Sequence, residues 1–222
     1  MKKFKGIVFD FNGTVITDDT FHLRAWRKHA RSLGKELTDE TYFARMHGST
    51  NDLIYKEIFG INVPEEDKMT VGQEKEIYYR EFMQKEPAPF AVGFKELLEF
   101  LKEHNIPHAI ATSSEISNVR FFDKLYGLYD LFDGNIIYND GTVRGKPFPD
   151  LFLKAGELLS LPMEDIITVE DANAGVRACR AAGAGMVVGI CPRGGNLFNG
   201  KEYTDLTITD FTELDYKNLF LY

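Results

Sequence analysis

Several polar residues of this chain have the types and spacing needed to bind and attack a phosphoryl group. Three groups stand at or next to the ends of short apolar runs: Asp10, Thr112 with Ser113 and Ser114, and Glu170 with Asp171. Lys146 lies in a turn just before a helical segment. Carboxylates such as those of Asp10 and Asp171 are the hard oxygen ligands that Mg²⁺ prefers, and a carboxylate can also attack phosphorus to give an aspartyl-phosphate. Lys146 and the Thr112 hydroxyl could hold the other phosphate oxygens and offset charge in the transition state.

Each of these residues also has a purely structural explanation when it is taken alone. Asp10 could close a turn, and one acid of the pair Glu170–Asp171 could cap the following helix. Lys146 precedes Pro147 and could simply be solvated. Four such features in one chain order are better explained by one shared site than by unrelated caps.

The elements that would position this site follow an alternating pattern. Short runs rich in Ile and Val predict buried strands at residues 6–11, 108–113, 134–138, 166–171, 185–190 and 205–208. Segments of helical length lie between them at 93–105, 149–161 and 172–184. This pattern predicts an α/β fold with a Rossmann-like three-layer core and a mainly parallel sheet. Ligands of such sheets bind beyond the carboxyl ends of the strands, where the polar residues would meet.

One long segment interrupts the alternation. Between about residues 17 and 87 there is no strand pattern, and 20–34, 50–60 and 72–85 have helical spacing. We therefore expect a core formed by residues 1–16 and 88–222, with residues 17–87 inserted as an all-helical cap. The last segment, 211–222, is expected to form an edge helix whose exposed apolar residues hint faintly at a dimer.

Charge and composition exclude several classes of function. The chain has 222 residues and a net charge of −8, which argues against non-specific binding of nucleic acid or membranes, because both need clustered positive charge. No apolar window approaches the roughly 18 residues of a membrane span, and no signal-peptide pattern is present. Cys179 and Cys191 form no CxxC pair and are expected to be free thiols. We expect a cytoplasmic protein, a monomer or weak homodimer, that binds a small phosphorylated metabolite.

Four motifs resemble those of the haloacid dehalogenase superfamily of phosphohydrolases. They are DFNGT (10–14), ATSS (111–114), KPFPD (146–150) and VEDANAG (169–175). The resemblance runs from residue 5 to about residue 191. Within the superfamily, TVITDDTFHLRAW (14–26) and KPFPDLF (146–152) resemble the β-phosphoglucomutase-like branch, in which a helical cap follows the first strand.

The resemblance implies a role for each motif. It assigns a nucleophile, Asp10; phosphate ligands, Thr112, Ser113 and Lys146; and Mg²⁺ ligands, Asp10, Asn12 through its backbone carbonyl, Asp171 and, beside it, Glu170. It also implies that the helical insert is a mobile cap that closes over the substrate and excludes water.

The chain departs from the family pattern at Asn12. The family has a second acid there, which protonates the leaving oxygen and then deprotonates the attacking water. An amide does neither, so a loss of about 10²–10⁴ in rate is expected. Three explanations of Asn12 are open. It is an engineered replacement of the usual aspartate, or a natural variant that acts on substrates with good leaving groups or uses another acid. In the third, the chain is a phosphate-binding protein with little turnover. His22, at the start of the cap, is a candidate acid, although a capping or packing role is the simpler explanation.

A phosphosugar mutase is the main competing enzyme class. Mutases of this branch hold a second phosphate with a cap arginine and a lysine after the second motif, and Asn51 and Glu115 stand at those positions here. Glu115 would repel a phosphate, and Arg80, late in the insert, is the remaining candidate cation. We therefore expect a phosphatase that hydrolyses a monophosphate, with the mutase and a non-catalytic phosphometabolite-binding protein as alternatives.

Overall fold

The computed structural model describes residues 2–47, 49, 51–67, 70–192 and 203–221. The chain divides into two compact units: Met1–Thr17 with Pro89–Tyr222, here named the core unit, and Asp18–Ala88, here named the helical unit. Each unit has a hydrophobic core of its own.

Among the described residues, the core unit contains a six-stranded parallel sheet. Its strands are β1 Gly6–Phe9, β2 His108–Glu115, β3 Ile136–Asn139, β4 Ile166–Glu170, β5 Met186–Ile190 and β6 Leu206–Ile208, in the spatial order β3-β2-β1-β4-β5-β6. Phe9 of β1 lies opposite Ile110 on one side and Val169 on the other. The order reverses between β1 and β4, and such a switch point is where doubly wound sheets bind their ligands.

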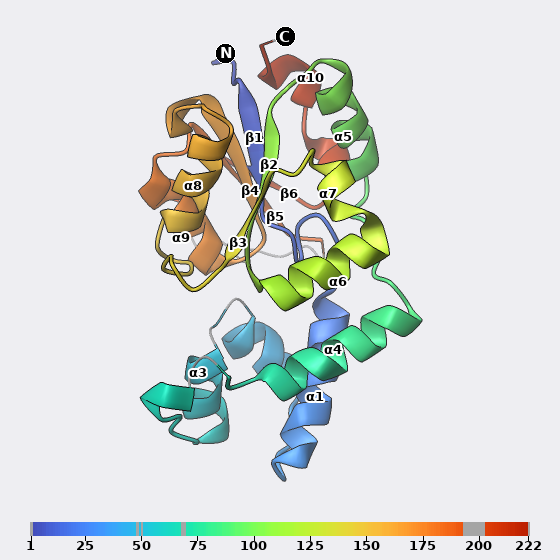
Figure 1. The fold of residues 1–222 in the computed structure, drawn as a ribbon, viewed down its shortest axis with the longest axis vertical. Helices are drawn as coiled ribbons and strands as arrows, with labels where there is room; N and C mark the ends of the chain where they lie inside the picture. The colour runs from blue at the N-terminus through green and yellow to red at the C-terminus, as the bar shows by residue number, and fades with distance from the viewer. Residues whose placement is uncertain (1, 48, 50, 68–69, 193–202, 222) are drawn as a thin grey trace. The chain divides into compact units, whose positions relative to one another are not determined.

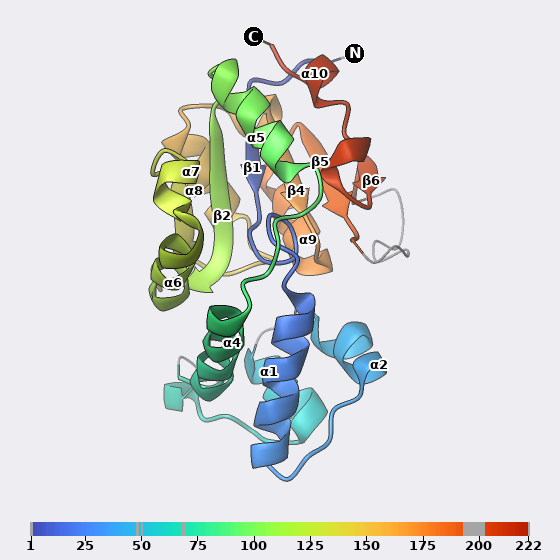
Figure 2. The same ribbon diagram turned by 90° about the vertical axis from the view of Figure 1, so that its right-hand side faces the viewer.

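Helices cover both faces of this sheet (Figure 1, Figure 2). They are α5 Phe94–Glu103, α6 Ile116–Tyr126, α7 Leu128–Leu131, α8 Asp150–Leu158 and α9 Asn173–Ala182. Helices α8 and α9 lie on one face, and α5, α6 and α7 lie on the other (Figure 1). These three layers confirm the predicted Rossmann-like fold, whereas α6 and α7 were not predicted.

Phe9 anchors the packing on the α5 face of the sheet. Its ring meets those of Phe94, Phe132 and Phe211 edge-on, at centroid distances of 5.6, 6.2 and 5.9 Å, and all four side chains are buried. Val8 packs into a separate cluster that contains buried residues of α8 and α9. Because successive strand residues point to opposite faces, one short strand is held by both halves of the core. Its carboxyl end is therefore fixed in position.

The C-terminal segment differs from the predicted edge helix. It forms a 3₁₀ turn at Phe211–Glu213 and a short helix, α10, at Tyr216–Leu219. Phe211 and Phe220 are buried, and the N–H of Phe4 donates to the last carbonyl of α10 at 2.8 Å. Most apolar side chains of this segment are buried, and its backbone forms hydrogen bonds with Phe4 near the start of the chain. The expectation of an exposed apolar helix face was therefore wrong.

The described part of the helical unit contains four α-helices: α1 Asp19–Ser32, α2 Asp39–Thr41, α3 Asn51–Ile54 and α4 Gln73–Lys85. π-Helical turns continue α2 and α3 at Tyr42–Met46 and Tyr55–Phe59. The predicted helices at 20–34 and 72–85 are present, and the one predicted at 50–60 is divided between α3 and a π-helical turn. No strand occurs in the part of this unit that the structure describes.

Aromatic side chains form the centre of the helical unit. The ring of Trp26 in α1 contacts Tyr55 and Phe59 at centroid distances of 6.3 and 5.9 Å. All three side chains are buried, together with Leu23 and Ala30 of the same helix. These aromatics therefore serve packing, as the apolar stripe along α1 indicates.

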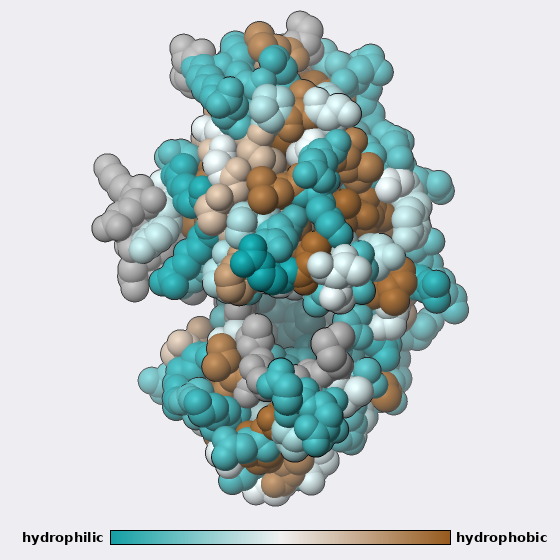
Figure 3. Space-filling model, turned by 60° about the vertical axis from the view of Figure 1, so that its left-hand side comes forward, coloured by the Kyte–Doolittle hydropathy of each residue, from teal (hydrophilic) through white to brown (hydrophobic). Residues whose placement is uncertain are grey.

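No helix within the described ranges is long and apolar enough to cross a membrane. On the face that Figure 3 shows, hydrophilic residues are interspersed with hydrophobic ones. Cys179 and Cys191 are both free and buried, as the sequence predicts.

Candidate active site

Asp10 is the first residue after β1, at the carboxyl edge of the sheet. Its N–H donates to the carbonyl of Val169 in β4 at 2.9 Å, which extends the hydrogen-bond ladder past the end of the strand. The chain then turns sharply, since Val15 N–H donates back to the Phe11 carbonyl at 2.9 Å and Gly13 has a φ of +78°. The Asp10 side chain is thereby delivered, buried, to the switch point between β1 and β4.

Lys146 brings the opposite charge to the same place. It lies in the loop before α8, and its Nζ is 2.5 Å from Asp10 Oδ1 and also contacts Glu170 Oε1. Only 8% of the Lys146 side chain is exposed, so both ion pairs are shielded from solvent. Lys146 is therefore a fixed cation between two carboxylates, and not the solvated lysine that the sequence alone allowed.

Glu170 is the last residue of β4, and both of its carboxylate oxygens are engaged. Oε1 pairs with Lys146, and Oε2 accepts the backbone N–H groups of Asp171 and Ala172 at 3.1 and 3.2 Å. Gly175 in α9 makes room for this side chain, because a Cβ there would lie 1.9 Å from the Glu170 carboxyl carbon. Glu170 therefore orients both Lys146 and the turn that carries Asp171.

Three buried acids of the core unit could hold a metal ion. Asp10, Glu170 and Asp171 each offer one carboxylate oxygen, and these oxygens lie within 4.8 Å of one another. Gly13 is required beside them, because a Cβ at that position would come within 2.1 Å of Asp171 Oδ2. Three acids around one lysine leave an excess of negative charge, which a divalent cation would balance. An all-oxygen donor set of this kind fits Mg²⁺.

Burial dominates the electrostatics of this cluster. It raises the pKa of Asp10 well above its usual range; Lys146 opposes that shift, and Glu170 and Asp171 reinforce it. Burial alone would lower the pKa of Lys146, but attraction to Asp10 and Glu170 outweighs burial and raises that pKa above its ordinary value. Lys146 therefore stays protonated at neutral pH, and an added cation would favour the ionised form of Asp10.

The second predicted motif places its hydroxyls in alternation along β2. Thr112 is buried, Ser113 is exposed and Ser114 is half-buried, as expected for successive residues of a strand. Thr112 Oγ1 accepts the N–H of Ser114 at 3.1 Å, and the Ser114 hydroxyl donates to Asn12 Oδ1 at 3.0 Å. Ser114 thus joins the predicted phosphate ligand to position 12. This link was not predicted from the sequence, although alternation from Thr112 points to Ser114.

His22, the candidate substitute acid, belongs to a hydrogen-bonded network of the helical unit. Its Nδ1 is 2.7 Å from the Lys75 ammonium, and its Nε2 is 3.3 Å from Asp18 Oδ2. The ring stacks on Tyr79 at 4.1 Å, and the Tyr79 hydroxyl donates to Asp18 Oδ2 at 2.5 Å. Because an ammonium can only donate, Nδ1 accepts and Nε2 carries the proton that faces Asp18. Both ring nitrogens are engaged inside this unit.

Lys75 was not singled out from the sequence, yet its side chain is 4% exposed. It lies on the buried face of α4 with Tyr79 and Met83, at a spacing of four that normally holds apolar residues. Its ammonium pairs with Glu76 at 2.8 Å and lies 5.5 Å from the centre of the Trp26 ring. A lysine inside an apolar stripe is the sequence signal that would have identified it.

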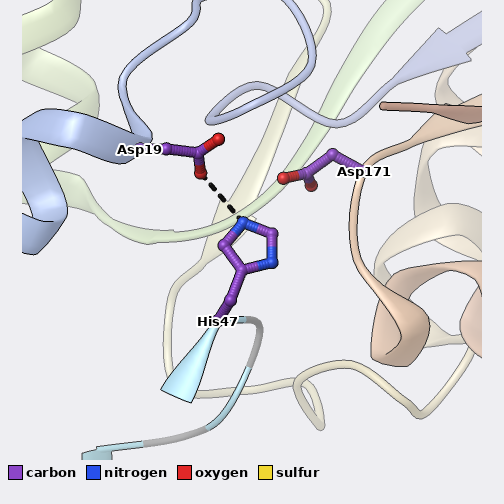
Figure 4. Close-up of side chains that lie close together, drawn as sticks. All are labelled: Asp19, His47 and Asp171. Carbon is purple, nitrogen blue, oxygen red and sulfur yellow. Dashed lines mark hydrogen bonds and ion pairs between the residues drawn. The ribbon is translucent and has the colours of Figure 1, made fainter. Parts of the chain in front are cut away.

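Asn51 and Arg80, the remaining candidates of the helical unit, and His47, which was not predicted, have defined places. Asn51 Nδ2 donates to the Val71 carbonyl at 3.1 Å, which fastens α3 to the segment before α4, and Arg80 is half-buried on α4. Figure 4 shows His47 with its ring toward the carboxylate of Asp19, and His47 Nε2 lies 2.9 Å from Asp19 Oδ1. Each of these contacts lies within the helical unit.

Comparison with known proteins places the motifs of this site in a family. A family model described as haloacid dehalogenase-like hydrolase matches residues 4–183. The chain is 28% identical over 189 residues to a phosphorylated carbohydrates phosphatase of Thermotoga maritima. The matched region covers 84% of this chain and 85% of that protein. It is 30% identical over 190 residues to hexitol phosphatase A of Escherichia coli, with 85% and 84% covered. The crystal structure of a HAD hydrolase, family IA, variant 3, from Entamoeba histolytica has a TM-score of 0.88 at 33% identity, with 99% and 97% covered.

The matched region contains every motif of the buried cluster. It includes the strand end that carries Asp10, the loop of Lys146 and the turn of Glu170 and Asp171. It also spans most of the chain, from β1 to α9. The chain therefore belongs to the family of haloacid dehalogenase-like hydrolases.

Proposed function

We propose that this protein is a Mg²⁺-dependent phosphatase that hydrolyses a phosphate monoester through an aspartyl-phosphate on Asp10. The observation that carries the proposal is the buried cluster in which Asp10 lies 2.5 Å from the Lys146 ammonium and offers an oxygen near one of Asp171. A carboxylate at a strand end, beside a fixed cation, is suited to attack a phosphoryl group whose charge that cation offsets. Residues 17–87 are proposed as the cap of this enzyme.

The reaction has two halves. In the first, a carboxylate oxygen of Asp10 attacks phosphorus, the bond to the leaving alcohol breaks, and its electron pair stays on the alcohol oxygen, which takes up a proton from solvent. Lys146 and the Thr112 hydroxyl offset charge on the phosphoryl oxygens. In the second, water attacks the phosphorus and its proton passes to solvent, while the bond from phosphorus to the Asp10 oxygen breaks, which releases phosphate and restores the Asp10 carboxylate.

Mg²⁺ would be held by Asp10, Asp171 and the backbone carbonyl of Asn12, with Glu170 as a further ligand or as the support of Lys146. When bound, the metal supplies positive charge against the phosphoryl oxygens. The arrangement of three buried acids around one lysine supports this assignment, because a cation beside the Asp10 carboxyl would favour the ionised form that attacks.

Asn12 limits proton transfer in both halves. Its amide can donate a hydrogen bond to the leaving oxygen but cannot transfer a proton. Since general acid–base catalysis is worth about 10²–10⁴ in rate, we expect slow turnover of alkyl phosphates and faster turnover of esters with acidic leaving groups. We propose a structural role for His22, because its ring nitrogens engage Lys75 and Asp18.

The proposed substrate is a small phosphorylated sugar or sugar alcohol. The support comes from two relatives that cover most of the chain, one named a phosphorylated carbohydrates phosphatase and the other hexitol phosphatase A. The competing mutase activity would need a second phosphate site. Glu115, exposed at the end of β2, would repel that phosphate, so hydrolysis is favoured.

The test is the release of inorganic phosphate from a panel of sugar phosphates in the presence of Mg²⁺. We expect slow release by this sequence, release about 10²–10⁴-fold faster by Asn12→Asp, and none by Asp10→Asn. Conversion of glucose 1-phosphate to glucose 6-phosphate without phosphate release would favour the mutase. No release by either this sequence or Asn12→Asp would contradict the phosphatase and leave a phosphate-binding protein.

A further inference from the structure

Ser114 and Asn12 are 102 residues apart in the sequence and are joined by a hydrogen bond of 3.0 Å. Resting on the proposed function, we infer that Ser114 is a positioning residue for Asn12. It holds the carbonyl end of the Asn12 amide, so that the amino end serves as the hydrogen-bond donor to the reacting phosphate ester. Neither the family motifs nor the relatives assign this role to Ser114.

The two ends of an amide have opposite chemistry. Oδ1 only accepts hydrogen bonds and Nδ2 only donates them, so a rotation of the Asn12 amide by a half-turn exchanges donor and acceptor. An acceptor facing a phosphoryl group would repel its oxygens, whereas a donor stabilises charge that develops on the leaving oxygen. The Ser114 hydroxyl donates to Oδ1 and so favours the orientation in which Nδ2 faces the substrate.

Ser114 is itself well fixed. It stands near the end of β2, its N–H donates to Thr112 Oγ1 at 3.1 Å, and its side chain is half-buried. Asn12 is half-buried in the turn after β1, the turn that also contains Gly13. A hydrogen bond between two partly desolvated groups on fixed elements is stronger than one in water. The pair therefore couples the phosphate-binding end of β2 to position 12.

An acid at position 12 would use the same serine differently. The two oxygens of a carboxylate are equivalent, so a half-turn rotation of the group leaves the atom that faces the substrate chemically the same. Ser114 should therefore affect the rate through orientation in this sequence and have little effect on the rate in the Asn12→Asp background.

The experiment places Ser114→Ala and Ser114→Thr in both backgrounds and measures the burst of p-nitrophenol, which reports attack on p-nitrophenyl phosphate, with Mg²⁺ present. In this sequence, Ser114→Ala should lower the rate constant of the burst about 5–30-fold, because the transition state of the first half loses a donor. Ser114→Thr, which keeps the hydroxyl, should retain this rate constant within about threefold. In the Asn12→Asp background, Ser114→Ala should change the same rate constant less than about twofold, because either oxygen of the carboxylate can face the substrate.

Two further measurements keep the result unambiguous. Ser117→Ala, at an exposed position of α6, is the matched control and should leave the rate constant of the burst unchanged. Orthovanadate, which imitates the five-coordinate phosphoryl group, provides a readout without turnover: Ser114→Ala should weaken its binding at least about fivefold in this sequence and less than twofold in the Asn12→Asp background. Equal losses in both backgrounds, or an unchanged rate constant of the burst in this sequence, would overturn the role of Ser114 even though the phosphatase stands. Absence of activity in the Asn12→Asp background would instead contradict the phosphatase itself.

Discussion

Replacement of Asp10 by Asn should abolish turnover and yet make the metal-free protein more stable. Asn has nearly the same shape as Asp but carries no charge, so it cannot attack phosphorus and has no buried charge to desolvate. The prediction depends on one property of the site: in the folded protein without metal, the ionised form of Asp10 is disfavoured.

The magnitude follows from the charges around Asp10. At an effective dielectric constant of about 20, the Lys146 ammonium at 2.5 Å attracts the carboxylate by roughly 6.6 kcal/mol, while an acid whose oxygen lies within 4.8 Å repels it by at least roughly 3.5 kcal/mol. The two repulsions, from Glu170 and Asp171, together at least offset the attraction and leave the cost of burial. We expect Asp10→Asn to stabilise the metal-free protein by about 1–2 kcal/mol, which raises Tm by roughly 2–8 °C in a chain of this size.

The pH dependence has a definite sign. Because the folded state holds the Asp10 proton more tightly than the unfolded state, ionisation of Asp10 destabilises the fold as pH rises. The advantage of Asp10→Asn should therefore be absent below the unfolded pKa of about 3.9 and grow as pH rises through the raised pKa of the folded protein. Added Mg²⁺ should stabilise the original sequence more than the variant.

Calorimetric unfolding in a chelator, at neutral pH and again in acid, measures this difference. Asp133→Asn is the matched control, because its carboxylate is 64% exposed, and it should change stability by less than about 0.5 kcal/mol. A lower Tm for Asp10→Asn than for the original sequence, in chelator at neutral pH, would refute the reasoning about burial.

Three further substitutions test other parts of the structure. Lys146→Met should lower kcat at least about 10²-fold and destabilise the fold by about 3–5 kcal/mol, because buried carboxylates lose their cation. Steady-state kinetics measures the first effect and urea unfolding the second, and unchanged stability would argue against the buried ion pairs. Gly13→Ala should destabilise by about 1–3 kcal/mol and weaken Mg²⁺ activation at least about tenfold, because the new Cβ would meet Asp171 Oδ2 at 2.1 Å; a Mg²⁺ titration of turnover checks it, and wild-type activation would count against the site. Tyr79→Phe should destabilise by about 1–3 kcal/mol, because Asp18 loses a buried donor; no loss in thermal unfolding would show that this bond is unimportant.

The sheet could be predicted because its central strands are buried on both faces. Every residue of β1 is buried, and such strands are continuous apolar runs bounded by polar residues. Once the strands were placed, the parallel order brought Asp10 and Glu170 to the same edge. Their partner Lys146 lies in a loop, so its position was predicted from the turn before a helical segment and not from strand periodicity.

The helices and the finer contacts were harder to predict. Helix α6 begins directly after β2 with no glycine or proline at the boundary, and the widened turn at Tyr55–Phe59 is a change in backbone hydrogen bonding that side-chain spacing does not record. The bond from Ser114 to Asn12 joins residues distant in sequence, so no local pattern contains it. Burial of Lys75 likewise depends on partners from another helix.

Covalent attack by Asp10 is tested most directly by trapping the phosphorylated protein. The chain is mixed with Mg²⁺ and p-nitrophenyl phosphate, quenched in acid and digested, and the phosphate is located by mass spectrometry. Because Asn12 cannot activate water for the second half of the reaction, the aspartyl-phosphate should accumulate. We predict phosphate on the peptide that contains Asp10, and none after the same treatment of Asp10→Asn. Phosphate on a different residue, or turnover by Asp10→Asn at the original rate, would contradict the role of Asp10 as the nucleophile.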